Sequence, residues 1–418
     1  MNMQDLPDRR GTDSYKWDLA RDGEIPLWVA DMDFPVAPEI TTALRERLDH
    51  PVFGYTAVPG TFREAFCAWQ RERNGWEVPP EHLVVVPGVM PAISLMVEEW
   101  TQPGDGVAIF SPVYFPFFDV VQDLGRRVER IPLAVETSPT GPRHVIDTER
   151  MESVLRGCAM LLLCSPHNPG GRVWTRDELA VIADAADRHG VVVISDEIHS
   201  DLLFPGERFV PWLSVDAVGG SGRGSGGSDG PARVALLSPS KTFNIPGLPT
   251  AFAVVPREGD RRDLERLLHA RKQDMSNLLA ITAADAAYRH GAAWLDEIRE
   301  VLYGNYRTVL EQLTREPGIA VYRMEGTFIA WIDFRRRPGW AEVAGASERF
   351  DEVARDHGVW LSRGRQFGPE GEGHMRLNFA TSPGRLEEGL NRLRLALDAF
   401  DESHGTDSPG SQGFPGPQ

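Results

Sequence analysis

Two runs of apolar residues in the middle of the chain constrain the fold more than any other feature. Met160–Cys164 and Val191–Ser195 are almost entirely apolar, and residues with helical spacing separate them between Arg176 and His189. Strands that are apolar on both faces are typical of a parallel sheet covered by helices on each side. The pattern therefore predicts an α/β fold built on a large, mostly parallel sheet.

Polar residues stand directly after these predicted strands. Asn168 follows the first strand, Asp196 and His199 follow the second, and a third apolar run, Ala232 to Leu237, leads to Lys241. In open α/β sheets, ligands bind at the carboxyl ends of the strands. We therefore expect these four side chains to converge on one crevice.

Lys241 is the candidate nucleophile. It stands in Ser238-Pro239-Ser240-Lys241, between a strand and a turn closed by Pro246 and Gly247. A partly desolvated lysine with small neighbours can form a Schiff base with a carbonyl compound. The alternative is an ordinary lysine at a strand end, which the fragment alone favours.

The turn around Gly88 is a candidate phosphate site. An apolar strand ends there and a helix begins, so the backbone N–H groups of Val89 and Met90 should be free to bind an anion. The chain has 44 Lys and Arg against 61 Asp and Glu, which gives a formal charge of −17. An acidic protein of this kind can bind an anionic ligand only at a local site with suitable donors. That charge disfavours nucleic acid and anionic membranes as partners. The turn around Gly88 is not specific to phosphate sites, since strand-glycine-helix turns are common in α/β proteins.

Tyr114 lies in an aromatic cluster after a strand and could stack on a planar cofactor or pack in the core.

The remaining composition predicts the domain organisation. A glycine- and serine-rich stretch, 218–231, is predicted to be a surface loop. We expect an N-terminal arm with part of a small domain at 1–48, a large domain at 49–285, a small α+β domain at 286–400 and a disordered tail at 401–418.

The cysteines and the N-terminus predict the compartment. Cys67, Cys158 and Cys164 are scattered and odd in number, so we expect neither a disulfide framework nor a metal site. The first residues are polar, without the apolar core of a signal peptide, and no stretch is as long as a membrane span. We expect a cytoplasmic protein.

Taken in order, these fragments resemble a known family. From about Trp28 to Leu397 the chain is similar to fold-type I enzymes of the class I/II aminotransferase superfamily, which use pyridoxal 5′-phosphate (PLP). The fragments that carry the resemblance are Tyr55, Gly88-Val89-Met90, Tyr114, Asn168-Pro169-Gly170-Gly171, Asp196 and Ser238-Pro239-Ser240-Lys241. The resemblance implies the three-layer PLP-dependent transferase fold, an amino-acid substrate and a homodimer with its sites at the subunit interface.

The resemblance also implies roles for residues around the cofactor ring. Lys241 would bond to the cofactor and, once displaced by the substrate amine, take the Cα proton. Asp196 would face the pyridine nitrogen, Asn168 would donate to the phenolic oxygen and Tyr114 would stack on the ring. His199 would lie beside the cofactor.

Further roles concern the phosphate and the substrate. Val89 and Met90 N–H groups with the Ser238 and Ser240 hydroxyls would hold the phosphate, and Tyr55 would reach it from the other subunit. Many class I aminotransferases carry an arginine eight residues after the lysine, where this chain has Pro249. The substrate would contact Ala30, Tyr114 and Arg376, which would bind the α-carboxylate. The alternative for Arg376 is a surface salt bridge.

Three longer segments resemble one branch of the superfamily, the MalY/PatB-type cystathionine β-lyases, also called cysteine-S-conjugate β-lyases. They are Trp28–Phe34, Asp196–Leu202 and Ser240–Leu248, with His199 where ordinary aminotransferases more often carry tyrosine. The implied reaction is α,β-elimination of a cysteine thioether to a thiol, pyruvate and ammonia. The aromatics Trp28, Phe34 and Phe115 suggest that an apolar substituent is tolerated.

Two alternatives stay open. An aminotransferase shares the early steps of the reaction, and the branch point is a difference between two barriers, in which ~1.4 kcal/mol changes the outcome tenfold. A regulatory or interaction protein is the third hypothesis. The presence of Lys241, Asp196 and Arg376 argues against it, because a binding module has no need of a Schiff-base lysine.

Overall fold

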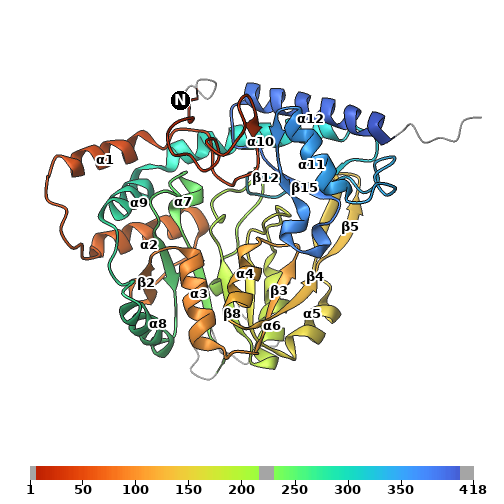
Figure 1. Cartoon of the computed structure of the whole chain (residues 1–418). Coiled ribbons are helices and arrows are strands. Elements are labelled where there is room, and N and C mark those ends of the chain that lie inside the picture. The colour runs from red at the N-terminus through yellow and green to blue at the C-terminus, as the bar shows by residue number, and fades with distance from the viewer. Residues whose placement is uncertain (1–5, 216–229, 405–418) are drawn as a thin grey trace, which may run out of the picture.

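The computed structural model describes residues 6–215 and 230–404, and its centre is a seven-stranded sheet (Figure 1). Every neighbouring pair in this sheet is parallel except at β10, which is antiparallel to both of its neighbours. The mostly parallel sheet expected from the sequence is confirmed. In sheet order the strands are β2 (Leu83–Val86), β10 (Ala251–Val254), β9 (Arg233–Leu237), β8 (Val192–Asp196), β7 (Cys158–Cys164), β3 (Gly106–Ser111) and β4 (Arg127–Pro132).

Both faces of this sheet are buried, as the apolar strands predict. On β7, Met160 and Leu162 join one hydrophobic cluster, whereas Leu161 and Leu163 join the other. The first cluster includes residues of α3 (Val89–Trp100), α4 (Pro116–Asp123) and α8 (Glu258–Ala270). The second includes residues of α2 (Gly60–Asn74), α6 (Arg176–His189) and α9 (Leu278–His290). The sheet is thus the middle of three layers.

A second, antiparallel sheet lies beyond the large one, in the upper part of Figure 1. Its strands are β11 (Ala320–Val321), β12 (Ile329–Asp333), β15 (His374–Asn378) and β14 (Ser362–Arg363). Three helices accompany it: α10 (Ala292–Leu313), α11 (Ala346–Asp356) and α12 (Pro383–His404). The N-terminal β1 (Ile25–Pro26) pairs with β13 (Val359–Trp360), while α1 (Pro38–Leu48) packs against α9. The N-terminal segment therefore belongs to both parts of the molecule.

Some local predictions are wrong. The polar composition of residues 136–144 predicts a loop, but these residues are part of a hairpin of β5 (Ala134–Ser138) and β6 (Gly141–Val145), in which apolar residues do not alternate with polar ones. Helical spacing predicts a long helical stretch from Arg261 to about Leu313, and the structure divides this stretch into three helices, α8, α9 and α10. The tail predicted from 401 begins as the end of α12; the rest of it, and most of the loop 218–231, lie outside the described residues.

The predicted limits of the domains stay a prediction. Among the described residues, no helix has the length and apolar character needed to cross a membrane. The three cysteines are free, with Cys164 buried at the end of β7.

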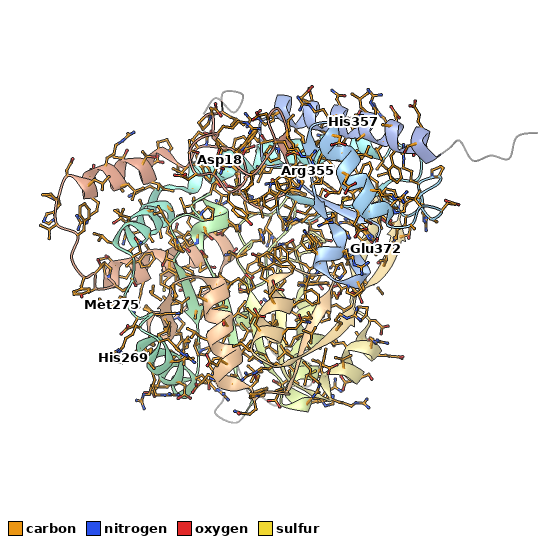
Figure 2. All side chains as sticks on the ribbon, in the orientation of Figure 1. Asp18, His269, Met275, Arg355, His357 and Glu372 are labelled. Carbon is orange, nitrogen blue, oxygen red and sulfur yellow. The ribbon has the colours of Figure 1, made fainter. Side chains whose placement is uncertain are left out.

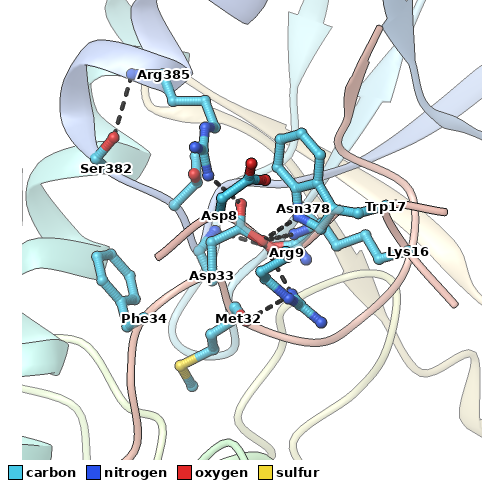
Figure 3. A network of polar contacts seen from close by, with 12 residues as sticks. Asp8, Arg9, Lys16, Trp17, Met32, Asp33, Phe34, Asn378, Ser382 and Arg385 are labelled. Carbon is cyan, nitrogen blue, oxygen red and sulfur yellow. Dashed lines mark hydrogen bonds and ion pairs between the residues drawn. The ribbon is translucent and has the colours of Figure 1, made fainter. Parts of the chain in front are cut away.

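A buried carboxylate, Asp33, ties the N-terminal segment to the C-terminal helix (Figure 3). Its oxygens lie 3.1 Å from Lys16 Nζ, 3.0 Å from Arg9, 2.8 Å from Trp17 Nε1 and 3.4 Å from Arg385 of α12. Burial alone would raise the pKa of this carboxyl, but Lys16, the Trp17 N–H and Arg385 help to lower it to about 2. We call this set, Arg9, Lys16, Trp17, Asp33 and Arg385, the Asp33 clasp.

Candidate active site

A cavity of about 520 Å³ lies at the carboxyl edge of the large sheet, where β2, β3, β7, β8 and β9 all end. Parallel strands place their carboxyl ends at one edge, which explains why residues far apart in sequence meet here. The cavity brings together nearly all the residues singled out in the sequence. They are Ala30, Val89, Met90, Tyr114, Asn168, Asp196, His199, Ser238, Ser240, Lys241 and Arg376.

Lys241 lies on α7 (Pro239–Thr242), a single helical turn that follows β9. The hydroxyl oxygen of Ser238 caps this turn by accepting the Ser240 N–H at 3.2 Å. Lys241 Nζ donates to the carbonyl of Ala30 at 2.6 Å. Burial lowers the pKa of this amine to about 8, with Asp31 and Asp196 opposing the shift and Arg376 adding to it. The neutral amine required of a nucleophile or base is therefore accessible near neutral pH.

Asp196 ends β8 and is buried beside the cavity. Among the described residues, the donor to its carboxylate is the Ile198 N–H at 3.1 Å. Burial raises the pKa of this carboxyl to about 6, although Ile198 N–H and Lys241 act in the opposite direction. A buried carboxylate that accepts so few hydrogen bonds within the protein can accept another from a cationic N–H group of a ligand.

Arg376 extends from the middle of β15 into the same cavity and is 4% exposed. Its acceptors among the described residues are neutral oxygens: Asn168 Oδ1 at 3.2 Å, Trp28 O at 2.7 Å and Ser362 Oγ at 3.4 Å. Burial lowers its pKa to about 10, so the group stays charged at neutral pH. The alternative of a surface salt bridge is therefore wrong, and the guanidinium is available to an anionic ligand.

Small donors around Gly88 and Ser238 also line the cavity. Gly88 precedes α3, whose first backbone N–H groups have no partner within the helix. The hydroxyl oxygens of Ser238 and Ser240 lie 3.0 Å apart, and Ser238 donates to the Thr250 carbonyl at 2.7 Å. This arrangement suits a phosphate group.

His199 lines the same cavity as Asp196 and is buried. Burial lowers the pKa of its imidazole to about 3, with Lys241 and Arg376 adding to the shift. Its Nδ1 has no hydrogen-bond partner among the described residues. The ring is therefore neutral at physiological pH.

The sequence profile of the aminotransferase class I and II family matches residues 23–393. This chain belongs to that family. Cystathionine beta-lyase PatB of Bacillus subtilis is 36% identical over 95% of this chain and 100% of its own length. Protein MalY of Escherichia coli is 34% identical over 94% and 97%. The solved PLP-bound C–S lyase of Staphylococcus hominis is 28% identical, with a TM-score of 0.85 over 95% of this chain and 98% of that one.

Two of the residues named from the sequence lie elsewhere in this member of the family. Tyr55 is outside the cavity, on the segment between α1 and α2, and is 96% exposed. Phe34 is 2% exposed in the hydrophobic core, so the expectation that it borders a substrate substituent is wrong. It faces the core because Asn244 binds the carbonyls of Met32 and Phe34 at 3.0 and 2.8 Å and holds the segment down.

Sequence reasoning also missed several residues of the cavity wall. Tyr15 and Gln366 are on segments without a motif, and Cys164, Thr250 and Ser362 were not singled out. Cys164 could have been predicted to lie at the cavity, because it is the last residue of a buried strand and ligands bind at the carboxyl ends of such strands. Thr250 directly follows Pro249, the residue that replaces the arginine of many family members, and both line the cavity.

Proposed function

We propose that this chain is a PLP-dependent C–S β-lyase that converts a cysteine thioether and one water to a thiol, pyruvate and ammonia. The observation that carries the proposal is the convergence of Lys241, Asp196 and Arg376 on one cavity. The relatives named cystathionine beta-lyase, which match over nearly the whole chain, support this reaction over transamination. Solved structures named C–S lyase point in the same direction.

The residues present fit PLP. The underpaired Asp196 suits the pyridine nitrogen, the amine of Lys241 suits the aldehyde, and the helix terminus at Val89 suits the phosphate. Asn168 would contact the phenolic oxygen, Tyr114 the ring face and Ser238 with Ser240 the phosphate. When bound, PLP supplies an electron-withdrawing ring that stabilises negative charge at the substrate Cα.

The protein's own side chains then supply orientation and proton transfer. Arg376 binds the α-carboxylate of the substrate and so directs the Cα–H bond toward Lys241. Lys241 Nζ takes the Cα proton, for which its lowered pKa of about 8 is suited. Asp196 would accept a hydrogen bond from the protonated ring nitrogen of PLP. The carbonyl of Ala30, 2.6 Å from Nζ, accepts from the amine when it is free.

The proposed assembly is a cytoplasmic homodimer with Tyr55 reaching the partner's phosphate. Leu48, Val52, Phe53 and Tyr55 are 51%, 61%, 58% and 96% exposed. Apolar side chains gathered on one segment favour burial against a second copy. Mixing Tyr55→Ala and Lys241→Ala variants tests the arrangement, because heterodimers regain one intact site only if Tyr55 acts across the interface. Mixtures that stay inactive after subunit exchange would contradict it.

The test of the reaction is to mix the purified holoenzyme with L-cystathionine, without keto acid, and follow pyruvate and free thiol together. We expect equal release of both over many turnovers. If the bound cofactor bleaches once and turnover requires a keto acid, the chain is an aminotransferase and the lyase proposal is wrong.

A further inference from the structure

A short segment of the C-terminal part docks on the edge of the large sheet next to the cavity. It comprises the 3-10 turns η3 (Gly364–Phe367) and η4 (Pro369–Gly371). One carboxylate oxygen of Glu370 accepts from the Ser111 hydroxyl at the end of β3, and the other contacts the guanidinium of Arg130 on β4. The Phe367 carbonyl accepts the Val113 N–H at 2.9 Å. We call Ser111, Arg130 and Glu370 the Glu370 latch.

Gly368 lets this segment approach the sheet edge closely. Its φ is +116°, and a Cβ placed there would lie 2.6 Å from Ser111 Oγ and 3.2 Å from Glu370 Oε2. Any other residue would therefore collide with the latch as well as strain the backbone. The backbone at this point is shaped to bring Glu370 onto Ser111.

Phe367 connects the latch to the cavity. It is fully buried, and the Arg376 guanidinium carbon lies 4.7 Å from its ring centroid. The ring also meets Phe115 and Trp331 edge-on, with centroids 6.1 and 5.4 Å away. The guanidinium is planar by resonance, so its contact with the Phe367 ring fixes the orientation of that plane, which bidentate carboxylate binding requires.

We propose that Glu370 is a positioning residue for recognition of the substrate α-carboxylate. By holding residues 364–371 on β3 and β4, it fixes Phe367, and Phe367 fixes the plane of Arg376. The proposal rests on the proposed function in one respect, the assignment of the amino-acid carboxylate to Arg376. It concerns binding of the carboxylate and leaves proton transfer by Lys241 unchanged.

Breaking the ion pair between Arg130 and Glu370 should have a moderate effect on substrate binding. The side chains of Arg130 and Glu370 are 39% and 23% exposed, so the ion pair is partly screened by water and salt. Glu370→Gln should raise the KM for S-ethyl-L-cysteine about fivefold, with kcat changed by less than about twofold. Arg130→Met should have a similar effect, and the double variant should be little worse than either.

Glu372→Gln is the matched control, and Glu372 is labelled in Figure 2. Its carboxylate also pairs with a serine and an arginine, Ser347 at 2.7 Å and Arg365 at 3.4 Å. Both partners belong to the C-terminal part itself, so their loss leaves the docking on β3 and β4 intact. This control should keep the wild-type KM.

A binding measurement separates carboxylate recognition from a general structural effect. L-Alanine and ethylamine differ by one carboxylate, and the visible absorbance of the holoenzyme reports the binding of each amine. In Glu370→Gln the dissociation constant of L-alanine should rise about fivefold and that of ethylamine should stay unchanged. An equal change for both amines, a fall in kcat at constant KM, or no change at all would overturn the proposal. Failure of the lyase proposal would show separately, as absence of pyruvate from the wild type.

Discussion

Asp33 and Asp196 are both almost completely buried, at 1% and 4% exposure, yet their surroundings are opposite. Asp33 contacts three cationic side chains and an indole N–H, and its pKa is lowered to about 2. Asp196 accepts from one backbone N–H, and burial raises its pKa to about 6. A carboxylate paired within the protein stabilises the fold, whereas one left underpaired is available to a ligand.

The same contrast applies to two lysines, the buried Lys16 and the half-buried Lys241. Lys16 Nζ lies 3.1 Å from the Asp33 carboxylate, whereas Lys241 Nζ donates to the neutral carbonyl of Ala30. The first lysine forms an ion pair with a buried carboxylate. The second can lose its proton near pH 8, as the proposed chemistry requires.

The largest expected effect is that of Lys241→Ala. We expect turnover to fall by at least about 10³-fold, because both the cofactor bond and the base are lost. The visible absorbance of the lysine-bound cofactor should disappear, while the thermal unfolding midpoint of the apoprotein should stay close to wild type. Retained turnover and absorbance would remove Lys241 from the site.

Asp33→Asn should lower the stability of the protein, whereas Lys241→Ala should lower its turnover. The first substitution removes the carboxylate 3.1 Å from the fully buried Lys16 and leaves Asp31, at 3.8 Å, as the remaining carboxylate, so we expect a loss of about 3 kcal/mol in the free energy of unfolding. Urea unfolding of the apoprotein measures this loss. Asp196→Asn is the matched substitution at the site: it should cost little stability but lower kcat strongly. If both variants lost stability equally, the proposed difference between the two carboxylates would be contradicted.

The pH dependence of apoprotein stability should sharpen the comparison further. The unfolded pKa of aspartate is near 3.9, so the contribution of Asp33, with a folded pKa of about 2, is present above pH 4 and lost as pH falls toward 2. Asp196 has a folded pKa of about 6, so ionising it destabilises the protein as pH rises from 4 to 6. Each effect should be about 2–3 kcal/mol.

Unfolding curves between pH 2 and 7 measure these opposite trends. Asp33→Asn should remove the decline below pH 4, and Asp196→Asn should remove the decline between pH 4 and 6. Profiles unchanged by either substitution would show that these groups do not set the pH dependence.

Local patterns predicted the large sheet and the residues along its edge. The expected helix from Arg176 to His189 has those same limits in α6, because Thr175 and Glu178 form a capping box and Gly190 ends the helix. The crevice followed from the polar residues after β7, β8 and β9, since parallel topology alone brings strand ends together.

The rest depends on contacts between distant segments, which leave no local pattern. Nothing near Asp33 in the sequence indicates Arg385, and nothing near Glu370 indicates Ser111 and Arg130. Phe34 was misassigned because an aromatic residue near a motif reads the same whether it faces the cavity or the core. Only the three-dimensional path of residues 28–34 decides between the two.

That path also affects how the protein is made. The Trp28 carbonyl accepts from Arg376, β1 pairs with β13, and Asp33 contacts Arg385, so residues 25–33 bind partners more than 300 positions later. During synthesis from the N-terminus, these partners leave the ribosome more than 300 residues after the segment itself. The segment therefore lacks these contacts until residues 359–385 have emerged. The cavity is complete only after that point, because Arg376 lines it, and such distant pairing favours slow final folding.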